Sequence, residues 1–373
     1  MGIKIGRIAG VIVLLGAAAA FGKFAANTGM FEKKPDAVYL TDNEEKNRIA
    51  YQSLDQKEKA VYSALYYGIA QKNELIPLPY EIDGDTYSKV YCLLEKQEGS
   101  FFYLGSSYYT AERIAKAQIV YRKNIEGADE KIEKLSQAEI DAVDEITSMS
   151  SMQTEYEKVM NINDYIVHNC SYVTGSEMEY SPTAYGCLVE HQANCEGYAK
   201  TFNMLANDLG LKSVLITGVT DKGENHAWNQ VKIDGEWYNI DVTWADPDEN
   251  DEVRRAYFLC DDKEFTKTHT ADEEFFKPYK CESTKNNYYI KNNILVKTED
   301  EARELIQKKI SQNEKTIEMK FSEETLYNEF KKKYITEQAI FDLLTESGME
   351  FTSTMRVSVR EGDGDLCMTL LID

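Results

Sequence analysis

The chain has 373 residues, of which 43% are hydrophobic and 28% charged, and a formal net charge of −22 at pH 7. This length predicts two or three domains. The acidic residues are dispersed and no basic patch occurs, so the charge pattern excludes nucleic acid as an expected partner and favours solubility. The seven cysteines lack the dense spacing of a disulfide scaffold, and most are expected to be small buried hydrophobic residues.

Residues 1–30 have the pattern of a targeting segment. Lys4 and Arg7 precede an uninterrupted apolar run over residues 8–21, like the positive and hydrophobic regions of a signal peptide. The run is shorter than the roughly 20 residues of a standard membrane span, so a cleaved signal and a retained membrane anchor both stay open. Either alternative predicts that the rest of the chain is extracytoplasmic, with residues 31–47 as a polar spacer.

Residues 48–150 are predicted to form a helix-rich region without a catalytic motif. Apolar residues from Val61 to Ile69 recur at four-residue spacing and predict a helix that ends near Gly68 or shortly beyond it. The region is therefore expected to have a packing or positioning role. Two short apolar runs are expected to be strands or buried segments, at residues 101–104 and 119–121.

Residues 151–283 place a cysteine, a histidine and an aspartate in chain order. A helix is predicted over residues 154–167, and Cys195 opens a second helical run that ends at Gly210, a natural helix end. A thiolate at a helix N-terminus is stabilised by the helix dipole. The position of Cys195 therefore favours a nucleophilic thiol over an inert buried one.

His226 and Asp241 are predicted to lie at the same end of one β-hairpin. The hairpin consists of a strand over residues 226–233, the turn signal Asp234-Gly235 and a returning strand over residues 237–242. Side chains on neighbouring strands come within about 5 Å of each other. Asp241 can therefore hold one imidazole nitrogen of His226 while the other nitrogen takes the thiol proton of Cys195.

These islands resemble the transglutaminase-like superfamily, and in particular its bacterial branch, which is similar to domains of cytokinesis and muscle-maintenance proteins. The sequence departs from the family pattern at Asn194 and Asn225, where small apolar residues and glycine are usual. The resemblance rests on Cys195-x-Gly197-Tyr198-Ala199, His226-Ala227-Trp228-Asn229, Asp234-Gly235-x-Trp237-Tyr238-x-x-Asp241-x-Thr243-Trp244-x-Asp246-Pro247, and Tyr257-Phe258-Leu259 continuing to His269.

The resemblance implies an α+β fold with a papain-like core, in which the active-site helix packs on an antiparallel sheet. The core is flanked by the helix-rich region and by a small C-terminal α+β domain over residues 284–373. It also implies a cysteine enzyme that acts on amide or peptide bonds through a thioester, by hydrolysis or by acyl transfer. The alternative is a non-catalytic cell-surface module that uses the same fold to bind a peptide. A protein or peptide is the expected partner, and the cell envelope a second candidate.

Three further residues are candidates for the site. Gln192, just upstream of the cysteine, is a candidate donor to the oxyanion. Trp228 and Trp244 are expected to pack in the core and are candidates for a wall of the substrate cleft.

No metal or other cofactor is expected at the site. Cys187, His191 and Cys195 recur every four residues, but they lack the fourth ligand and the paired close spacings of structural zinc. The acidic run from Asp246 to Asp251 imitates the start of a calcium loop and then departs from it. A calcium site of another geometry stays open.

The C-terminal domain is predicted from local patterns. Thr298 and Glu301 form a capping-box signal, Gly348 ends the last helix, and the chain closes in a hairpin around residues 362–364. The expected elements are helices over residues 302–310, 323–333 and 336–347 and strands over residues 316–321, 355–360 and 366–372.

Overall fold

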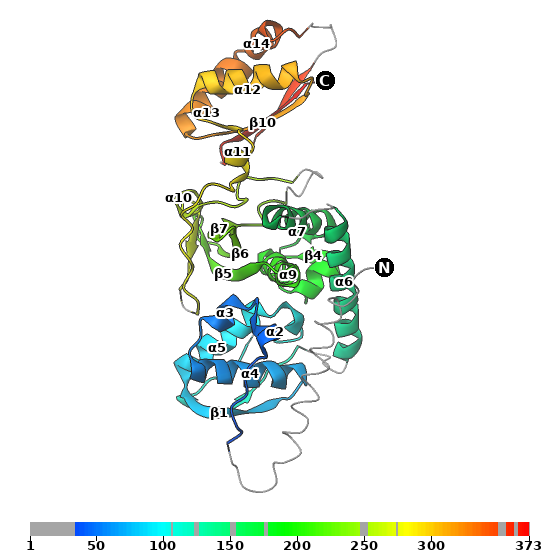
Figure 1. Ribbon diagram of the computed structural model, residues 1–373, viewed down its shortest axis with the longest axis vertical. Helices are drawn as coiled ribbons and strands as arrows, with labels where there is room; N and C mark the ends of the chain where they lie inside the picture. The colour runs from blue at the N-terminus through cyan, green and yellow to red at the C-terminus, as the bar shows by residue number, and fades with distance from the viewer. Residues whose placement is uncertain are drawn as a thin grey trace. The chain divides into compact units, whose positions relative to one another are not determined.

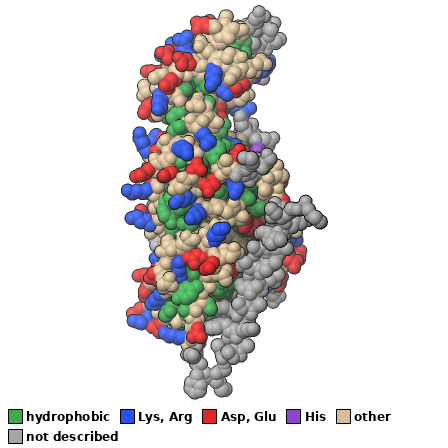
Figure 2. All heavy atoms as spheres, viewed as in Figure 1, with side chains coloured by type: hydrophobic (Ala, Val, Ile, Leu, Met, Phe, Trp, Pro, Cys, Tyr) green, Lys and Arg blue, Asp and Glu red, His purple; other side chains and the backbone are tan. Residues whose placement is uncertain are grey.

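The computed structural model describes residues 34–105, 107–122, 127–149, 154–174, 178–246, 253–273, 275–349, 356–361 and 365–372. Its chain forms two compact units, Met1–Ser283 and Thr284–Asp373. Helices and antiparallel sheets occur in both units (Figure 1), so the α+β class predicted from the sequence is confirmed. Acidic and basic side chains are interspersed on the face seen in Figure 2, which agrees with the dispersed charge of the sequence.

Several predicted features lie outside the described residues. These are the targeting or anchor segment over residues 1–30 and most of the calcium-like loop after Asp246. Within the described ranges, no helix combines the length and apolar character needed to cross a membrane. The described part of the predicted spacer packs on α4 (Gln56–Ala70), where the Leu40 backbone N–H donates to Ser63 Oγ at 3.1 Å.

The region that precedes the catalytic motifs contains a strand pair as well as helices. Strands β1 (Leu75–Asp83) and β2 (Arg113–Gln118) are antiparallel, and the sequence patterns did not predict them because Pro77 and Pro79 interrupt the first. Residues 101–104 form a buried 3₁₀ and turn segment rather than a strand. The region's other elements are α2 (Asp42–Glu45), α3 (Ile49–Gln52), α5 (Gly84–Gln97) and the short helix η1 (Gly99–Phe101).

The helices around the catalytic motifs begin where the sequence has capping residues. Thr154 caps α7 (Glu155–Asn169) in a capping box with Glu157, and Thr183 caps α8 (Ala184–Leu188). The central helix is α9 (Cys195–Asp208), which ends before Gly210 at a φ of +78°. The remaining elements here are α6 (Ala128–Ser148) and the parallel two-residue strands β3 (Ser171–Tyr172) and β4 (Gln192–Ala193).

Helix α9 packs against a four-stranded antiparallel sheet in the order β7-β6-β5-β8 (Figure 1). The turn between β6 and β7 has positive φ at both Asp234 and Gly235, as the hairpin signal predicts. Asn229 ties the layers together, because its Nδ2 donates to the Ala199 carbonyl of α9 at 3.0 Å. The sheet consists of β5 (Lys212–Thr220), β6 (Asn225–Ile233), β7 (Glu236–Ile240) and β8 (His269–Ala271), and the short helix α10 (Asp262–Phe265) precedes β8.

The second unit has its own core beneath a four-stranded sheet in the order β11-β12-β10-β9. Its predicted elements are found, but the helix expected over residues 323–333 passes into a π-helical turn, Lys331–Thr336, and the next helix starts later than predicted, after Gln338 at a φ of +63°. The elements are α11 (Tyr288–Lys291), β9 (Leu295–Val296), α12 (Glu299–Ser311), β10 (Thr316–Phe321), α13 (Glu324–Phe330), η3 (Lys331–Thr336), α14 (Ile340–Glu346), β11 (Val357–Glu361) and β12 (Cys367–Ile372).

Candidate active site

Cys195 is the first residue of α9, and Asn194 is the cap of that helix. The Asn194 side chain oxygen accepts hydrogen bonds from the backbone N–H groups of Glu196 at 3.0 Å and Gly197 at 3.3 Å. This capping explains why a polar residue stands where the family usually has a small apolar one. The half-buried Cys195 side chain packs against a small apolar cluster of Ala199, Leu215 and Ala227.

The motif around Cys195 is fixed by close packing. A Cβ on Gly197 would lie 2.4 Å from the Ser181 carbonyl oxygen, so a larger residue would push the helix away from its neighbour. Tyr198 is fully buried, and its hydroxyl donates to Asp246 Oδ2 and lies 3.1 Å from the Cys170 carbonyl oxygen. Both residues hold the start of α9 in place, and with it the thiol.

His226 and Asp241 are in direct contact. His226 lies at the start of β6 and Asp241 directly after β7, and His226 Nε2 is 2.8 Å from Asp241 Oδ2. The Cys195 side chain lies close enough to the ring to act on it, since it contributes to raising the pKa of His226. The structure therefore brings together the three residues that the sequence singled out, in the order thiol, imidazole, carboxylate.

The Asp241 carboxylate is completely enclosed and has four hydrogen-bond donors. Its Oδ1 accepts from the backbone N–H groups of Thr243 at 2.9 Å and Trp244 at 3.1 Å. Its Oδ2 accepts from His226 and also faces Nε2 of a second histidine, His269, at 3.2 Å. Neither oxygen is left without a partner, which removes the main penalty for burying a charge.

The charges of this pair perturb both pKa values. Burial by itself lowers the pKa of His226, but the charge of Asp241 and hydrogen bonds to Asp241 and Cys195 outweigh it and raise the pKa from 6.5 to about 10. Burial raises the pKa of Asp241, yet the charge and hydrogen bond of His226, with smaller contributions from His269, bring it well below its usual range. An imidazolium paired with a carboxylate is thus the stable state near neutral pH.

Two of the three tryptophans surround the histidine pair. Trp228 is buried, with its ring stacked 6.3 Å from that of His226. Trp244 is half-buried and lies 5.5 Å from His226 and 4.5 Å from His269, so it is the one of the two that reaches the surface. Trp237 is remote from this group and stacks on Tyr279 at 4.1 Å.

An ionic network links α9 to α5. Glu196 accepts from Lys96 and from Lys200, both at 2.8 Å, and Lys200 also binds Glu95. Burial raises the pKa of Glu196, but the charges of Lys200 and Lys96 bring it down to about 2. The carboxylate beside Cys195 is thereby balanced by two ammonium groups, one of them from the N-terminal region.

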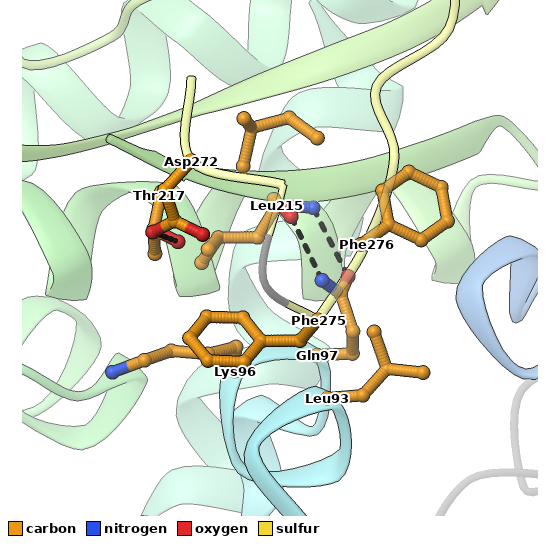
Figure 3. A pocket seen from close by; sticks show the side chains of 9 residues that line it. Leu93, Lys96, Gln97, Leu215, Thr217, Asp272, Phe275 and Phe276 are labelled. Atoms are coloured by element: carbon orange, nitrogen blue, oxygen red, sulfur yellow. Dashed lines mark hydrogen bonds between the residues drawn. The ribbon is translucent and has the colours of Figure 1, made fainter. Parts of the chain in front are cut away.

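A pocket lies where α5, β5 and the segment after β8 meet (Figure 3). Gln97 forms one wall: its side chain donates to the Leu215 carbonyl at 2.8 Å and accepts from the Leu215 N–H at 3.0 Å. Leu215 also belongs to the small apolar cluster against which Cys195 packs, so the pocket shares one residue with the surroundings of the thiol. The lining residues are Leu93, Lys96, Gln97, Leu215, Ile216, Thr217, Asp272, Phe275 and Phe276.

Gln192 and the possible metal ligands lie in several parts of the domain. Gln192 lies in β4, three residues before Cys195, and its role as an oxyanion donor stays a prediction. His191 is exposed and hydrogen-bonds through Nδ1 to the Asn169 carbonyl at 2.8 Å. Within the described ranges, the one group with ligand atoms close enough for a metal is His226, Asp241 and His269, within 4.8 Å of one another. The Nε2 atoms of this group already face the carboxylate as hydrogen-bond donors.

Sequence reasoning did not assign a role to His269, Lys96 or Gln97. His269 stood at the end of the family resemblance, 28 residues from Asp241, but β8 reaches Asp241 only through its pairing with β5. Lys96 and Gln97 lie about a hundred residues upstream of the helix they contact. None of these contacts follows from a local pattern, because each depends on how the layers pack.

The comparisons with known proteins agree with this geometry. Residues 141–242 match the model of the transglutaminase-like superfamily, so the resemblance seen in the sequence motifs is confirmed for this part of the chain. Kyphoscoliosis peptidase from Homo sapiens is 29% identical over 119 residues, covering 28% of this chain and 18% of that protein. The Mus musculus protein of the same name is 28% identical over 111 residues, covering 26% and 17%. The chain therefore spans less than a fifth of the length of these relatives.

Solved structures with partial similarity include two bacterial proteins. One is a candidate cysteine protease from Cytophaga hutchinsonii, with 24% identity and a TM-score of 0.26, covering 29% of this chain and 37% of that one. The other is the periplasmic domain of TgpA from Pseudomonas aeruginosa, with 13% identity and a TM-score of 0.24 over 36% and 55% of the two chains. These scores are too low to bear on function.

Proposed function

Because residues 141–242 form a transglutaminase-like domain, we propose that the protein is a cysteine enzyme that cleaves amide bonds through a thioester. The observation that carries this proposal is the contact of His226 Nε2 with Asp241 Oδ2 at 2.8 Å, on a histidine whose pKa is also raised by Cys195 at the start of α9. The base is in hydrogen-bond contact with the orienting carboxylate, and the thiol interacts with the same imidazole, which is the arrangement that covalent catalysis uses.

The reaction would proceed in two halves. In the first, the Cys195 thiolate adds to the carbonyl carbon, and His226 gives the proton it holds to the departing amine or ammonia as the C–N bond breaks. In the second, His226 takes a proton from water or from an acceptor amine, which attacks the thioester and releases the thiol. Asp241 stays ionised throughout and stabilises the imidazolium.

The oxyanion would be bound at the start of α9. Asn194 occupies the N–H groups of Glu196 and Gly197, and the residues that the structure describes supply no acceptor for the Cys195 N–H. That N–H is therefore available to a developing oxyanion, in the positive field of the helix N-terminus. Gln192 is proposed as the second donor.

A peptide or protein is the proposed substrate, with the cell envelope as a second candidate source. The partly exposed pocket between Gln97, Phe275 and Leu215 is largely apolar and shares Leu215 with the cluster against which Cys195 packs. Trp244 is proposed as the opposite wall of the cleft, since its half-buried ring lies beside His226. The name of the curated relatives supports hydrolysis of the thioester, and nothing in the described site selects water over an amine.

We propose an extracytoplasmic location, supported by the basic and apolar sequence pattern of residues 1–30. Protease added to intact cells should then digest the domain that contains Cys195. Protection of that domain until the membrane is opened would refute the location. Fractionation of the full-length chain with membranes would indicate a retained anchor, and an N-terminus near Phe21 would indicate a cleaved signal.

The second candidate function is a non-catalytic peptide-binding module. Such a module would use the same fold, and it predicts that Cys195 reacts like an ordinary thiol. Iodoacetamide labelling followed by peptide mapping separates the two functions. A catalytic Cys195 should be alkylated at pH 6 to 7 faster than the other cysteines, whereas a binding module should give no selective labelling in that range.

The test of the reaction is a peptide library incubated with and without a primary amine. Ammonia release, peptide cleavage and amine incorporation are measured on the same samples. Cys195→Ala is the control, and Cys92→Ala, at another partly exposed thiol, is the matched variant. The proposal predicts that activity is lost in Cys195→Ala and kept in Cys92→Ala, and activity that survives in Cys195→Ala would refute it.

A further inference from the structure

Among the described residues, the Asp241 carboxylate binds two backbone N–H groups, His226 and His269, and of these partners His269 has no assigned role. Its Nε2 lies 3.2 Å from Asp241 Oδ2, the same oxygen that His226 Nε2 approaches at 2.8 Å. The side chains of His269 and Asp241 are both completely inaccessible to solvent. Two imidazoles thus converge on one buried oxygen.

The His269 ring is held from several sides. Its Nδ1 lies 2.9 Å from the Thr268 hydroxyl oxygen, and its face stacks on Phe265 with the ring centres 4.0 Å apart. Trp244 and Trp228 enclose it at 4.5 and 5.2 Å. The titratable groups that face it are His226 from β6, Asp241 after β7 and Tyr257, whose ring centre is 5.4 Å away. The ring therefore has little freedom to turn.

The shared oxygen fixes where the protons are. An ionised carboxylate only accepts hydrogen bonds, so both Nε2 atoms must carry a hydrogen. On His226 this leaves Nδ1 as the nitrogen that exchanges a proton with Cys195. On Asp241, each carboxylate oxygen therefore accepts two hydrogen bonds. The donors are the Thr243 and Trp244 backbone N–H groups for Oδ1 and the two histidines for Oδ2, and together they fix the orientation of the carboxylate plane.

We propose that His269 is a positioning residue for the active site. By donating to Asp241 Oδ2 it keeps the carboxylate turned toward His226, and so keeps the His226 ring in the orientation and tautomer that pair with Cys195. The inference rests on the proposed function only in so far as the site is catalytic. The protonation of His226 and the reactivity of Cys195, which His269 should control, are both measured without any substrate.

The test compares three substitutions at this position. His269→Gln keeps an N–H donor at nearly the same reach as Nε2, His269→Asn is polar but too short, and His269→Phe keeps a ring without a donor. The rate of Cys195 alkylation by iodoacetamide is measured from pH 5 to 9, together with the thermal midpoint of each variant. A thiolate–imidazolium pair gives a rate that is nearly constant below pH 8, whereas an ordinary thiol gives a rate that rises about tenfold for each pH unit.

His269→Gln should keep the constant rate, within about threefold of the unmodified protein. In His269→Phe and His269→Asn the alkylation rate should depend on pH and be at least roughly tenfold lower at pH 6.5. This corresponds to a change of about one unit in the pKa of the thiol and imidazole pair. If His269→Phe keeps the flat profile, or if the Gln and Phe variants lose rate equally along with stability, His269 has only a packing role and the inference is overturned.

A second measurement separates the inference from the proposed function and covers variants that fold poorly. The chain has only four histidines, so ¹⁵N-histidine NMR resolves the ring nitrogens of His226 in the full chain. His226 should be protonated at Nε2 in the parent and in His269→Gln, and should lose slow exchange at this proton in His269→Asn. Unchanged Nε2–H exchange in His269→Asn would refute the positioning role. A flat alkylation profile that depends on His269, in a protein without amide turnover, would refute the proposed reaction alone.

Discussion

Asp241→Asn tests most directly whether the negative charge of Asp241 stabilises the His226 imidazolium. The amide is almost the same size as the carboxylate, and its oxygen can still accept from the Thr243 and Trp244 backbone N–H groups. Its NH₂ group then faces the Nε2–H groups of His226 and His269, where only an acceptor fits. His226 is driven to the opposite tautomer, with a hydrogen on the nitrogen that faces Cys195, and can no longer take the thiol proton.

The magnitude follows from the pKa of His226. A rise from 6.5 to about 10 corresponds to roughly 5 kcal/mol in favour of the imidazolium, at about 1.4 kcal/mol for each pH unit. Asp241 is the largest contributor to that rise and Cys195 a smaller one, so the lost stabilisation is about 3 to 4 kcal/mol. Turnover should fall by roughly 10² to 10³. His226→Ala should cost more, because it removes the base itself.

The assay is Cys195 alkylation at pH 6.5, with turnover measured in parallel once a substrate is known. Asp262→Asn is the matched control, because Asp262 is a half-buried carboxylate that binds Asn239 and the Cys281 N–H without touching the histidines. The control should stay within about threefold of the unmodified protein. If Asp241→Asn alkylates at the parental rate, or if His226→Ala is the milder variant, the assigned roles are wrong.

Four further outcomes are expected. Cys195→Ala should abolish amide-directed activity while its urea midpoint stays close to that of the parent, because the change is small and Asn194 still caps the helix; retained turnover would contradict the mechanism. Asn194→Ala should lower the free energy of unfolding by about 1 kcal/mol in urea titrations. Gly197→Ala should cost more than that, since its Cβ would lie 2.4 Å from the Ser181 carbonyl, and a smaller loss would show that α9 can shift. The ion pair of His226 should contribute its full stabilisation below pH 6.5 and lose it as pH rises through about 10. If the difference in the free energy of unfolding between the parent and His226→Ala were the same below pH 6.5 and above pH 10, the ion pair would be refuted.

The sequence determined the local parts of the site. Capping residues placed the starts of α7, α9 and α12, and the Asp234-Gly235 turn fixed the register that sets Asn229 opposite Ile240, the last residue of β7. These features depend on neighbours within a few residues, where backbone geometry and side-chain capping decide the outcome. The order of cysteine, histidine and aspartate was readable for the same reason.

Only the tertiary structure decided what surrounds those residues. His269 reaches Asp241 because β8 pairs with β5, and Lys96 reaches Glu196 because α5 packs beside α9. The strand pair β1 and β2 formed in spite of Pro77, since burial on α4 and α5 outweighs a weak local preference. Contacts between segments far apart in sequence leave no periodic signal, because they depend on the shape of the packed layers. The enclosure of Asp241 by four donors was therefore not visible in the sequence, although each donor was.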